Sequence, residues 1–174
     1  MEINSSKKIR LSDRIDCFNL DGRDFLRQVV IPDVARRILD GGSRIAKKEF
    51  FVVMNLPAIA VEFLNVLPGC LDAHLSRTED GTGENEEDGC FWSERPFSVT
   101  VYCYCFSNAD DVVTHTRSRV EAVLGTTFGE ENCQIRNVRN VAPKKEMMVA
   151  KVRLTSDVLL SKNCEPTAKR QKVG

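Results

Sequence analysis

The sequence has few residues of the kinds that build metal or disulfide sites. It contains two histidines, His74 and His115, and its seven cysteines include no C-x-x-C pair. Because neither zinc-ligand spacing nor an even disulfide set is present, we expect no metal, reduced thiols and an intracellular protein. Cys103 and Cys105 lie two apart in a strand-like run, which predicts two small buried side chains on one face.

Long apolar runs are missing too. No segment reaches the roughly 18 apolar residues of a membrane span, and residues 1–10 lack the apolar core of a signal peptide, so we expect no membrane partner. Acids and bases balance at 25 each among 174 residues, but the net charge is +3 over residues 1–50, −7 over 51–96 and +4 over 97–174. The two ends could face a polyanion, and the middle could not.

The most informative feature that is present is the run FFVVMNLPA at residues 50–58. Its five apolar residues without alternation predict a strand over residues 49–54 that is buried on both faces, as in a parallel sheet. Ligands bind at the carboxyl ends of such strands, so Asn55 is a candidate functional residue, and Pro57 stiffens the turn that follows. Asn55 could equally serve only as the cap of the next helix.

The rest of the chain alternates strands and helices, which predicts an α/β fold with a mostly parallel sheet in one domain. Helical segments are expected after Gly22, over residues 34–39, from Ile59 onward, and from a Ser107-Asn108 cap to Gly125. The predicted strands are residues 14–19, 49–54, 97–106, 133–142 and 146–154, the last two forming an antiparallel hairpin that closes the sheet edge.

We divide the chain into a domain over residues 14–155 and a polar basic tail over residues 156–174. Inside the domain we predict an acidic flexible loop over residues 76–95. Its composition is explained more simply by a solvated loop than by an acidic patch that binds a partner. The basic run at residues 169–172 of the tail is a weak nuclear import motif.

Two strand ends carry polar residues that can share one crevice, because the carboxyl ends of neighbouring strands lie on one rim of a doubly wound sheet. One end is Asp21-Gly22, after the first predicted strand, and the other is Asn55. Asp21 can accept from an exocyclic amine or a ribose hydroxyl, and Gly22 lets a planar ring approach the backbone.

Clustered bases near the predicted hairpin and on the preceding helix could contact RNA phosphates. At the hairpin these are Arg139, Lys144 and Lys145, together with Arg136, and the helix is expected to expose Arg117 and Arg119. Lysines at a hairpin tip also protect sheet edges and aid solubility without binding anything.

Five separated motifs run in order through most of residues 14–155: NLDGRDF at 19–25, MNLPA and EFL within 54–64, VYCYCFS at 101–107, RVEAVLG at 119–125 and VRNVAPKKEM at 138–147. Together they resemble the carboxyl-terminal half of the catalytic domain of eukaryotic and archaeal tRNA (guanine-37-N1)-methyltransferases. The resemblance implies a Rossmann-like class I methyltransferase sheet and methylation of N1 of guanosine 37, next to the anticodon. The methyl donor would be S-adenosyl-L-methionine, and the substrate tRNA.

By that resemblance Asp21 and Gly22 would flank the cofactor's adenine. Asn55 would lie at the transfer site, contacting cofactor or target base, and Pro57 would shape the base pocket. No residue at this rim is an obvious general base, and Glu62 is expected to be a solvated helix residue. The full-length family form is expected to be a monomer, in the cytoplasm, mitochondrial matrix or nucleus.

The family's amino-terminal strands, its glycine-rich cofactor loop and its tRNA-recognition domains have no counterpart before Met1, so we expect this chain alone not to be an independent enzyme. A non-catalytic RNA-binding or regulatory fragment is one alternative. A related wybutosine-pathway transferase, which moves a different group of the same cofactor, is another, although the Asn-Leu-Pro run favours a methyltransferase.

Overall fold

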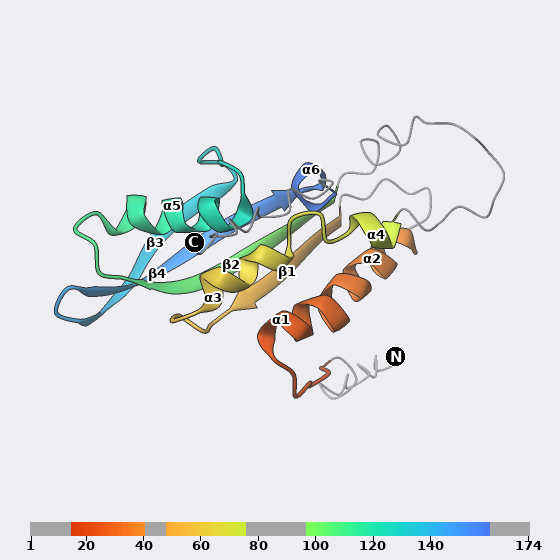
Figure 1. Ribbon diagram of the computed structural model, residues 1–174, viewed down its shortest axis with the longest axis horizontal. Helices are drawn as coiled ribbons and strands as arrows, with labels where there is room; N and C mark the ends of the chain where they lie inside the picture. Colours follow the sequence, from red (N-terminus) through yellow and green to blue (C-terminus); the bar gives the residue numbers. More distant parts are fainter. Residues whose placement is uncertain (1–14, 41–47, 76–96, 161–174) are drawn as a thin grey trace, which may run out of the picture.

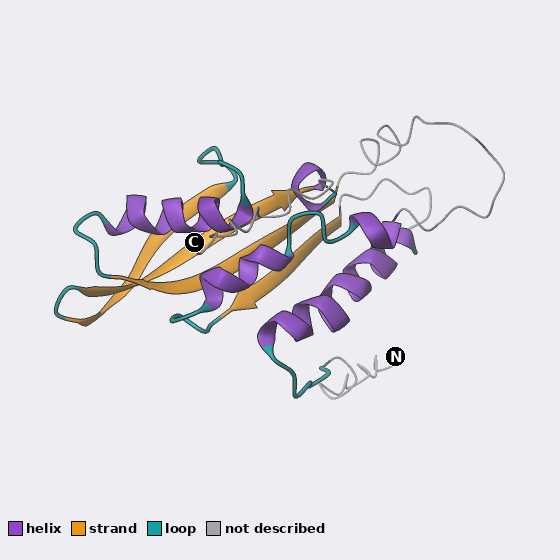
Figure 2. Cartoon of the chain, in the orientation of Figure 1, coloured by secondary structure: helices purple, strands orange, loops and turns teal. Residues whose placement is uncertain are grey.

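The computed structural model describes residues 15–40, 48–75 and 97–160, which form a four-stranded sheet with helices on one face (Figure 1, Figure 2). This confirms the predicted α/β class. The strands are β1 (Lys48–Met54), β2 (Phe97–Ser107), β3 (Cys133–Ala142) and β4 (Lys145–Thr155). The helices are α1 (Gly22–Phe25), α2 (Ile31–Leu39), α3 (Ala60–Phe63), α4 (Asp72–Leu75), α5 (Val112–Leu124) and α6 (Ser156–Leu159), with a π-helical segment η2 (Leu26–Val30) and a 3-10 turn η3 (Leu64–Val66).

The strand order is β1-β2-β4-β3. Strand β2 is parallel to β1 and antiparallel to β4, and β4 is antiparallel to β3. Strands β1, β2 and β3 therefore run in one direction and β4 runs against them. Only the β1–β2 pairing is parallel, so the described sheet is mixed and not mostly parallel as predicted. The predicted hairpin is confirmed as β3 and β4 and closes one edge. The reversed strand itself lies inside the sheet, between β2 and β3, because the hairpin folds back against β2.

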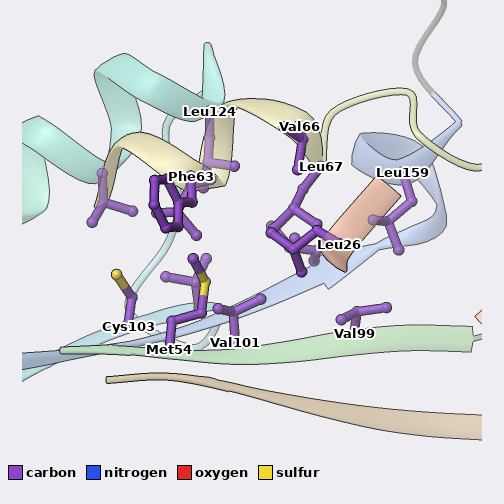
Figure 3. Packing of buried hydrophobic residues seen from close by; sticks show 14 of the residues in the cluster. Leu26, Met54, Phe63, Val66, Leu67, Val99, Val101, Cys103, Leu124 and Leu159 are labelled. Atoms are coloured by element: carbon purple, nitrogen blue, oxygen red, sulfur yellow. The ribbon is translucent and has the colours of Figure 1, made fainter. Parts of the chain in front are cut away.

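The core lies between the sheet and the helices (Figure 3). On β2 it takes every second residue, and Val101, Cys103 and Cys105 have no exposed surface. Figure 3 shows the strands of the sheet below Phe63 of α3, Leu124 of α5 and Leu159 of α6. The prediction of two buried thiols at residues 103 and 105 is confirmed, and burial raises the pKa of Cys103 to about 12.

No described helix packs on the opposite face of the sheet, which we call the open face. On β1, the side chains of Phe51 and Val53 are 62% and 66% exposed, whereas Met54 on the helix side is buried. The prediction that this strand is buried on both faces is therefore wrong for the described part of the chain, because its helices all pack on one side. A parallel strand with large apolar side chains is normally covered on both faces.

The segment from α1 to α2 forms one continuous helical run from Gly22 to Leu39. The π-helical segment η2 precedes Pro32, which has no backbone N–H, and the wider turns carry the helix past this residue. Further along the chain, α5 ends at Gly125 as predicted, with φ of 67°. Its cap is Asp111, whose carboxylate accepts from the N–H groups of residues 113 and 114, and not the predicted Ser107-Asn108 pair.

The strand predicted over residues 14–19 is wrong for its described part, because residues 15–19 pair with no described strand. Ile15 and Phe18 are 58% and 52% exposed there, and Phe18 contacts Phe25 of α1 with ring centroids 5.6 Å apart. A segment of β-like composition does not form a strand unless a neighbouring strand is there to hydrogen-bond with its backbone.

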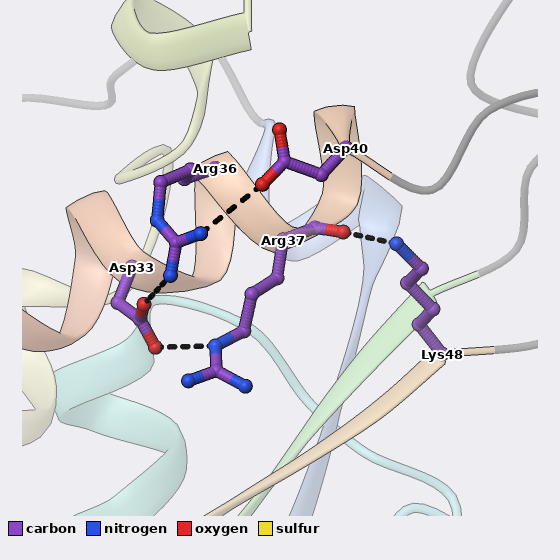
Figure 4. A network of polar contacts seen from close by, with 5 residues as sticks. All are labelled: Asp33, Arg36, Arg37, Asp40 and Lys48. Atoms are coloured by element: carbon purple, nitrogen blue, oxygen red, sulfur yellow. Dashed lines mark hydrogen bonds and ion pairs between the residues drawn. The ribbon is translucent and has the colours of Figure 1, made fainter.

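Polar contacts on α2 bind its exposed turns together and connect its end to β1 (Figure 4). Asp33 accepts from Arg36 at 2.5 Å and from Arg37 at 2.6 Å, and Lys48 donates to the carbonyl of Arg37. Partial burial opposes ionisation of Asp33, but these two guanidinium groups lower its pKa below the ordinary value.

The predicted acidic loop at residues 76–95 lies outside the described residues, as do residues 161–174 of the predicted tail. Residues Ser156–Leu159 form α6, and the domain boundaries stay a prediction. No helix in the described ranges combines the length and apolar character of a membrane span.

Candidate functional site

Asn55 follows β1 directly and its side chain is exposed at the carboxyl end of the strand. It does not cap the next helix. Helix α3 begins at Ala60 with Ile59 at its cap position, and the N–H groups of Ile59 and Ala60 both donate to the carbonyl of Leu56. The simple explanation of Asn55 as a helix cap therefore fails, and a polar side chain is left at the rim where α/β sheets bind ligands.

The turn after Asn55 is tied to the end of β2. The N–H of Phe106 donates to the carbonyl of Pro57 at 3.1 Å. Pro57 is half-buried and precedes α3 by three residues, so it shapes the turn and does not start the helix. This hydrogen bond joins the turn after β1 to the carboxyl end of β2.

Asp21 caps α1. Its Oδ1 accepts from the N–H of Arg23 at 2.9 Å, and Oδ2 has no hydrogen-bond partner within the described ranges. The side chain is exposed, so one carboxylate oxygen stays available to a ligand.

Gly22 is needed for packing. A Cβ built on it would lie 2.6 Å from Cε2 of Phe63, which is 4% exposed. The space that the missing side chain leaves is therefore taken up by a ring of this chain itself, on α3. This contact could not be predicted from the sequence, because Phe63 lies 41 positions from Gly22.

Helix α3 connects the two predicted parts of the site, the Asp21-Gly22 segment and the turn after Asn55. Its amino-terminal side follows the turn of Asn55 and Pro57, and its last residue packs on Gly22. Next to that contact the guanidinium of Arg23 lies 4.7 Å from the centre of the Phe63 ring, and 3.7 Å from the carboxylate of Glu62. The side chain of Glu62 is 61% exposed, which confirms a solvated residue and gives no support to a general base there.

Arg117 and Arg119 are half-buried, and the expectation that both are exposed for RNA is wrong. Arg117 donates to the carbonyls of Phe128 at 3.2 Å and Cys133 at 2.7 Å. Arg119 donates to the carbonyl of Phe106 at 2.9 Å. Both donate to backbone carbonyls of other segments, so the nitrogens that form these bonds are engaged within the fold.

The hairpin tip retains exposed positive charge. Arg139, Lys144 and Lys145 are exposed and form no ion pair with another described residue. The nearby carboxylate of Glu146 accepts from Nδ2 of Asn137 at 2.7 Å and of Asn140 at 3.1 Å, so it is engaged by amides and not by these bases.

Lys144 adopts φ of 58° at the tight turn, and Nζ of Lys145 lies 4.3 Å from the centre of the Phe106 ring. The tip is thus in contact with the same residue that holds Pro57. This connection between the predicted RNA-contacting bases and the predicted transfer site was not visible in the sequence.

Ser107 and His115 form a further polar pair at this end of β2. The Ser107 hydroxyl and Nδ1 of His115 are 2.8 Å apart, and Ser107 is buried. Neither residue was predicted to belong to the site.

A hollow of about 210 Å³ lies elsewhere, on the open face of the sheet. It contains none of the predicted site residues; its lining includes Glu49, Phe51, Thr100, Tyr102, Lys151 and Arg153. Among the described residues no group of three or more histidines, cysteines or acids is arranged to hold a metal ion.

The mixed four-stranded sheet, its helical layer and the polar rim define an α/β domain that is consistent with a methyltransferase fold. Sequence comparison is more specific. A tRNA (guanine(37)-N(1))-methyltransferase of Xenopus tropicalis is 36% identical over 171 residues, which is 97% of this chain and 31% of that protein. The mouse and human proteins of the same name are 34% and 32% identical over 99% and 94% of this chain.

The predicted resemblance to tRNA (guanine(37)-N(1))-methyltransferases is thus confirmed along nearly the whole chain. The chain spans about a third of the length of the curated relatives it matches. No family model matches it, and no solved structure does.

Proposed function

We propose that this chain is part of an enzyme that methylates N1 of guanosine 37 in tRNA, with S-adenosyl-L-methionine as methyl donor. The observation that carries the proposal is the similarity to enzymes of that name over nearly the whole chain. The exposed Asn55, which the structure leaves without a capping role at the carboxyl end of β1, supports it. The wybutosine-pathway alternative gains no support from the names of these relatives.

The finer fold that we propose is a Rossmann-like class I methyltransferase sheet. Three co-directional strands with one reversed strand suit it, as does a rim of polar residues at the carboxyl ends of β1 and β2. The open face bearing Phe51 and Val53, and the outer edge of β1, are where further helices and strands of such a sheet would pack.

The residues at the rim fit the cofactor in part. Asp21 keeps one exposed carboxylate oxygen that can accept from an adenine amine or a ribose hydroxyl. Gly22 adjoins it, although its missing side chain serves Phe63 first. Bound there, the cofactor would supply an electrophilic methyl group on a sulfonium.

The task of the chain itself is positioning. N1 of guanine must lie in line with the methyl group and must lose its proton, and such alignment is worth several orders of magnitude in rate. Asn55 can orient the base or the cofactor through its amide, and Pro57 would shape the binding pocket for the base. Arg139, Lys144 and Lys145 would contact phosphates of the RNA at the hairpin tip. We further propose an intracellular location, because the cysteines in the described residues are all free thiols.

The direct experiment incubates the full-length gene product with S-adenosyl-L-methionine and two tRNA transcripts that differ only in carrying G or A at position 37. We expect one methyl group per transcript with G37, mapped to N1 by nuclease digestion and mass spectrometry, and none with A37. RNA binding without modification would favour the non-catalytic alternative. A modification with another mass would favour the wybutosine-pathway transferase.

A further inference from the structure

Phe106, at the end of β2, is held from three directions. Its N–H donates to the carbonyl of Pro57 at 3.1 Å, and its carbonyl accepts from Nη1 of Arg119 at 2.9 Å. Its ring lies beneath the ammonium group of Lys145 at 4.3 Å. One residue thus joins the turn after Asn55, helix α5 and the hairpin tip.

The bond from Arg119 is suited to fixing a position. A hydrogen bond from a charged donor is stronger than a neutral one, and a half-buried guanidinium loses less to competing water. Arg119 holds the carbonyl on one side of the Phe106 Cα, and Pro57 is bonded to the N–H on the other side. Movement of the Phe106 backbone would therefore move the turn that contains Pro57 and follows Asn55.

Arg117 is the matched control, because it stabilises the fold in the same way as Arg119 but is not bonded to Phe106. It lies one half-turn earlier on α5, is also half-buried, and also donates to backbone carbonyls. The carbonyls that accept from Arg117 belong to Phe128 and Cys133. Neither of these residues forms a described hydrogen bond with the turn after Asn55. Arg117 also lies 3.7 Å from the carboxylate of Glu121.

We propose that Arg119 is a positioning residue for methyl transfer, which acts through Phe106 to hold the Asn55–Pro57 turn in place. This rests on the proposed function for the site itself. Arg119 touches neither cofactor nor RNA in this role. Its loss should lower the rate of the transfer step and leave the binding of both substrates nearly unchanged, because misplacement by about 1 Å costs on the order of 10²-fold in rate.

The test compares Arg119→Gln, Arg119→Lys and Arg117→Gln in the full-length gene product. We expect Arg119→Gln to lower the single-turnover rate by roughly 10- to 100-fold, with dissociation constants for cofactor and tRNA within about twofold of the parent. Arg119→Lys retains a charged donor and should recover most of that rate. Arg117→Gln should lower the unfolding temperature by about as much as Arg119→Gln does, but it should keep the single-turnover rate within about threefold of the parent.

Hydrogen exchange supplies a second measurement that does not depend on activity. In Arg119→Gln the amides of Phe106, Ile59 and Ala60 should exchange faster than in the parent, and in Arg117→Gln they should not. A full rate in Arg119→Gln, or equal rate losses in both glutamine variants, would overturn the proposal.

If the parent protein does not methylate tRNA at all, the proposed function fails and hydrogen exchange alone decides the role of Arg119. Unchanged protection of Phe106 in Arg119→Gln would then overturn it.

Discussion

Replacement of Gly22 by alanine tests the close contact between the start of α1 and Phe63 of α3. The new Cβ would lie 2.6 Å from Cε2 and 3.0 Å from Cδ2 of Phe63, well inside ordinary contact distance. The ring cannot swing out freely, because Phe63 is 4% exposed and the guanidinium of Arg23 lies over it. Either the ring or the start of α1 must shift.

The expected cost follows from two opposing effects. Overpacking of this kind destabilises by about 1–3 kcal/mol. Alanine regains roughly 0.5–1 kcal/mol over glycine inside a helix, and less here because Gly22 is the first residue of α1. We therefore expect Gly22→Ala to lower the free energy of unfolding by about 1–2 kcal/mol.

The assay is urea unfolding of the cofactor-free, full-length gene product, within a cycle that includes Phe63→Leu and the double variant. Leucine removes the ring that the Cβ meets, so the coupling energy should be about 1 kcal/mol or more. Gly125→Ala is the control, since its φ of 67° strains alanine while no atom lies within 4 Å. It should also be destabilised, but without coupling to Phe63.

Full stability of cofactor-free Gly22→Ala, together with weakened cofactor binding, would refute this reasoning. It would mean that Gly22 serves the cofactor and that the Phe63 contact is unimportant.

Further predictions address the cofactor, the RNA and the buried thiols. Asp21→Ala should weaken cofactor binding by about 1.5–3 kcal/mol in calorimetry, as for a hydrogen bond to a charged group, and unchanged affinity would leave Asp21 as a helix cap only. Lys144→Gln and Lys145→Gln should each reduce the slope of log affinity for tRNA against log salt by roughly 0.7–0.9, whereas an unchanged slope would assign these lysines to solubility. Because burial raises the pKa of Cys103 to about 12, native protein should react with iodoacetamide far more slowly at Cys103 than at the exposed Cys17, and rapid labelling at pH 8 would contradict this. The same raised pKa means that the folded form holds this proton more tightly than the unfolded form, so its contribution to stability should be complete below about pH 8.5 and decline as the pH rises toward 12.

The elements that were predictable from sequence are those with local signals. Helix α5 ends where Gly125 allows a positive φ, and the β3–β4 hairpin follows from two strand-like runs around Pro143. The strand predicted at residues 14–19 had the same kind of composition. That prediction was wrong because a strand also needs a neighbouring strand, and the local sequence does not reveal which segments pair.

The site shows the same division. Asn55 could be picked out from the end of an apolar run, but only the observed start of α3 at Ala60 shows that it is not a cap. The contact of Gly22 with Phe63 and the bond from Arg119 to Phe106 join residues 41 and 13 positions apart. Such contacts depend on how helices pack on the sheet, which side-chain type and spacing do not reveal.

The central claim is that the carboxyl end of β1 is the methyl-transfer site, and a single-turnover assay of Asn55→Ala tests it most directly. The matched control is Asn65→Ala, an exposed asparagine on η3 of the same chain segment. With G37 tRNA and saturating cofactor, the full-length Asn55→Ala protein should transfer methyl at least ~10²-fold more slowly than the parent, and Asn65→Ala at the parental rate. A near-parental rate for Asn55→Ala would contradict the account.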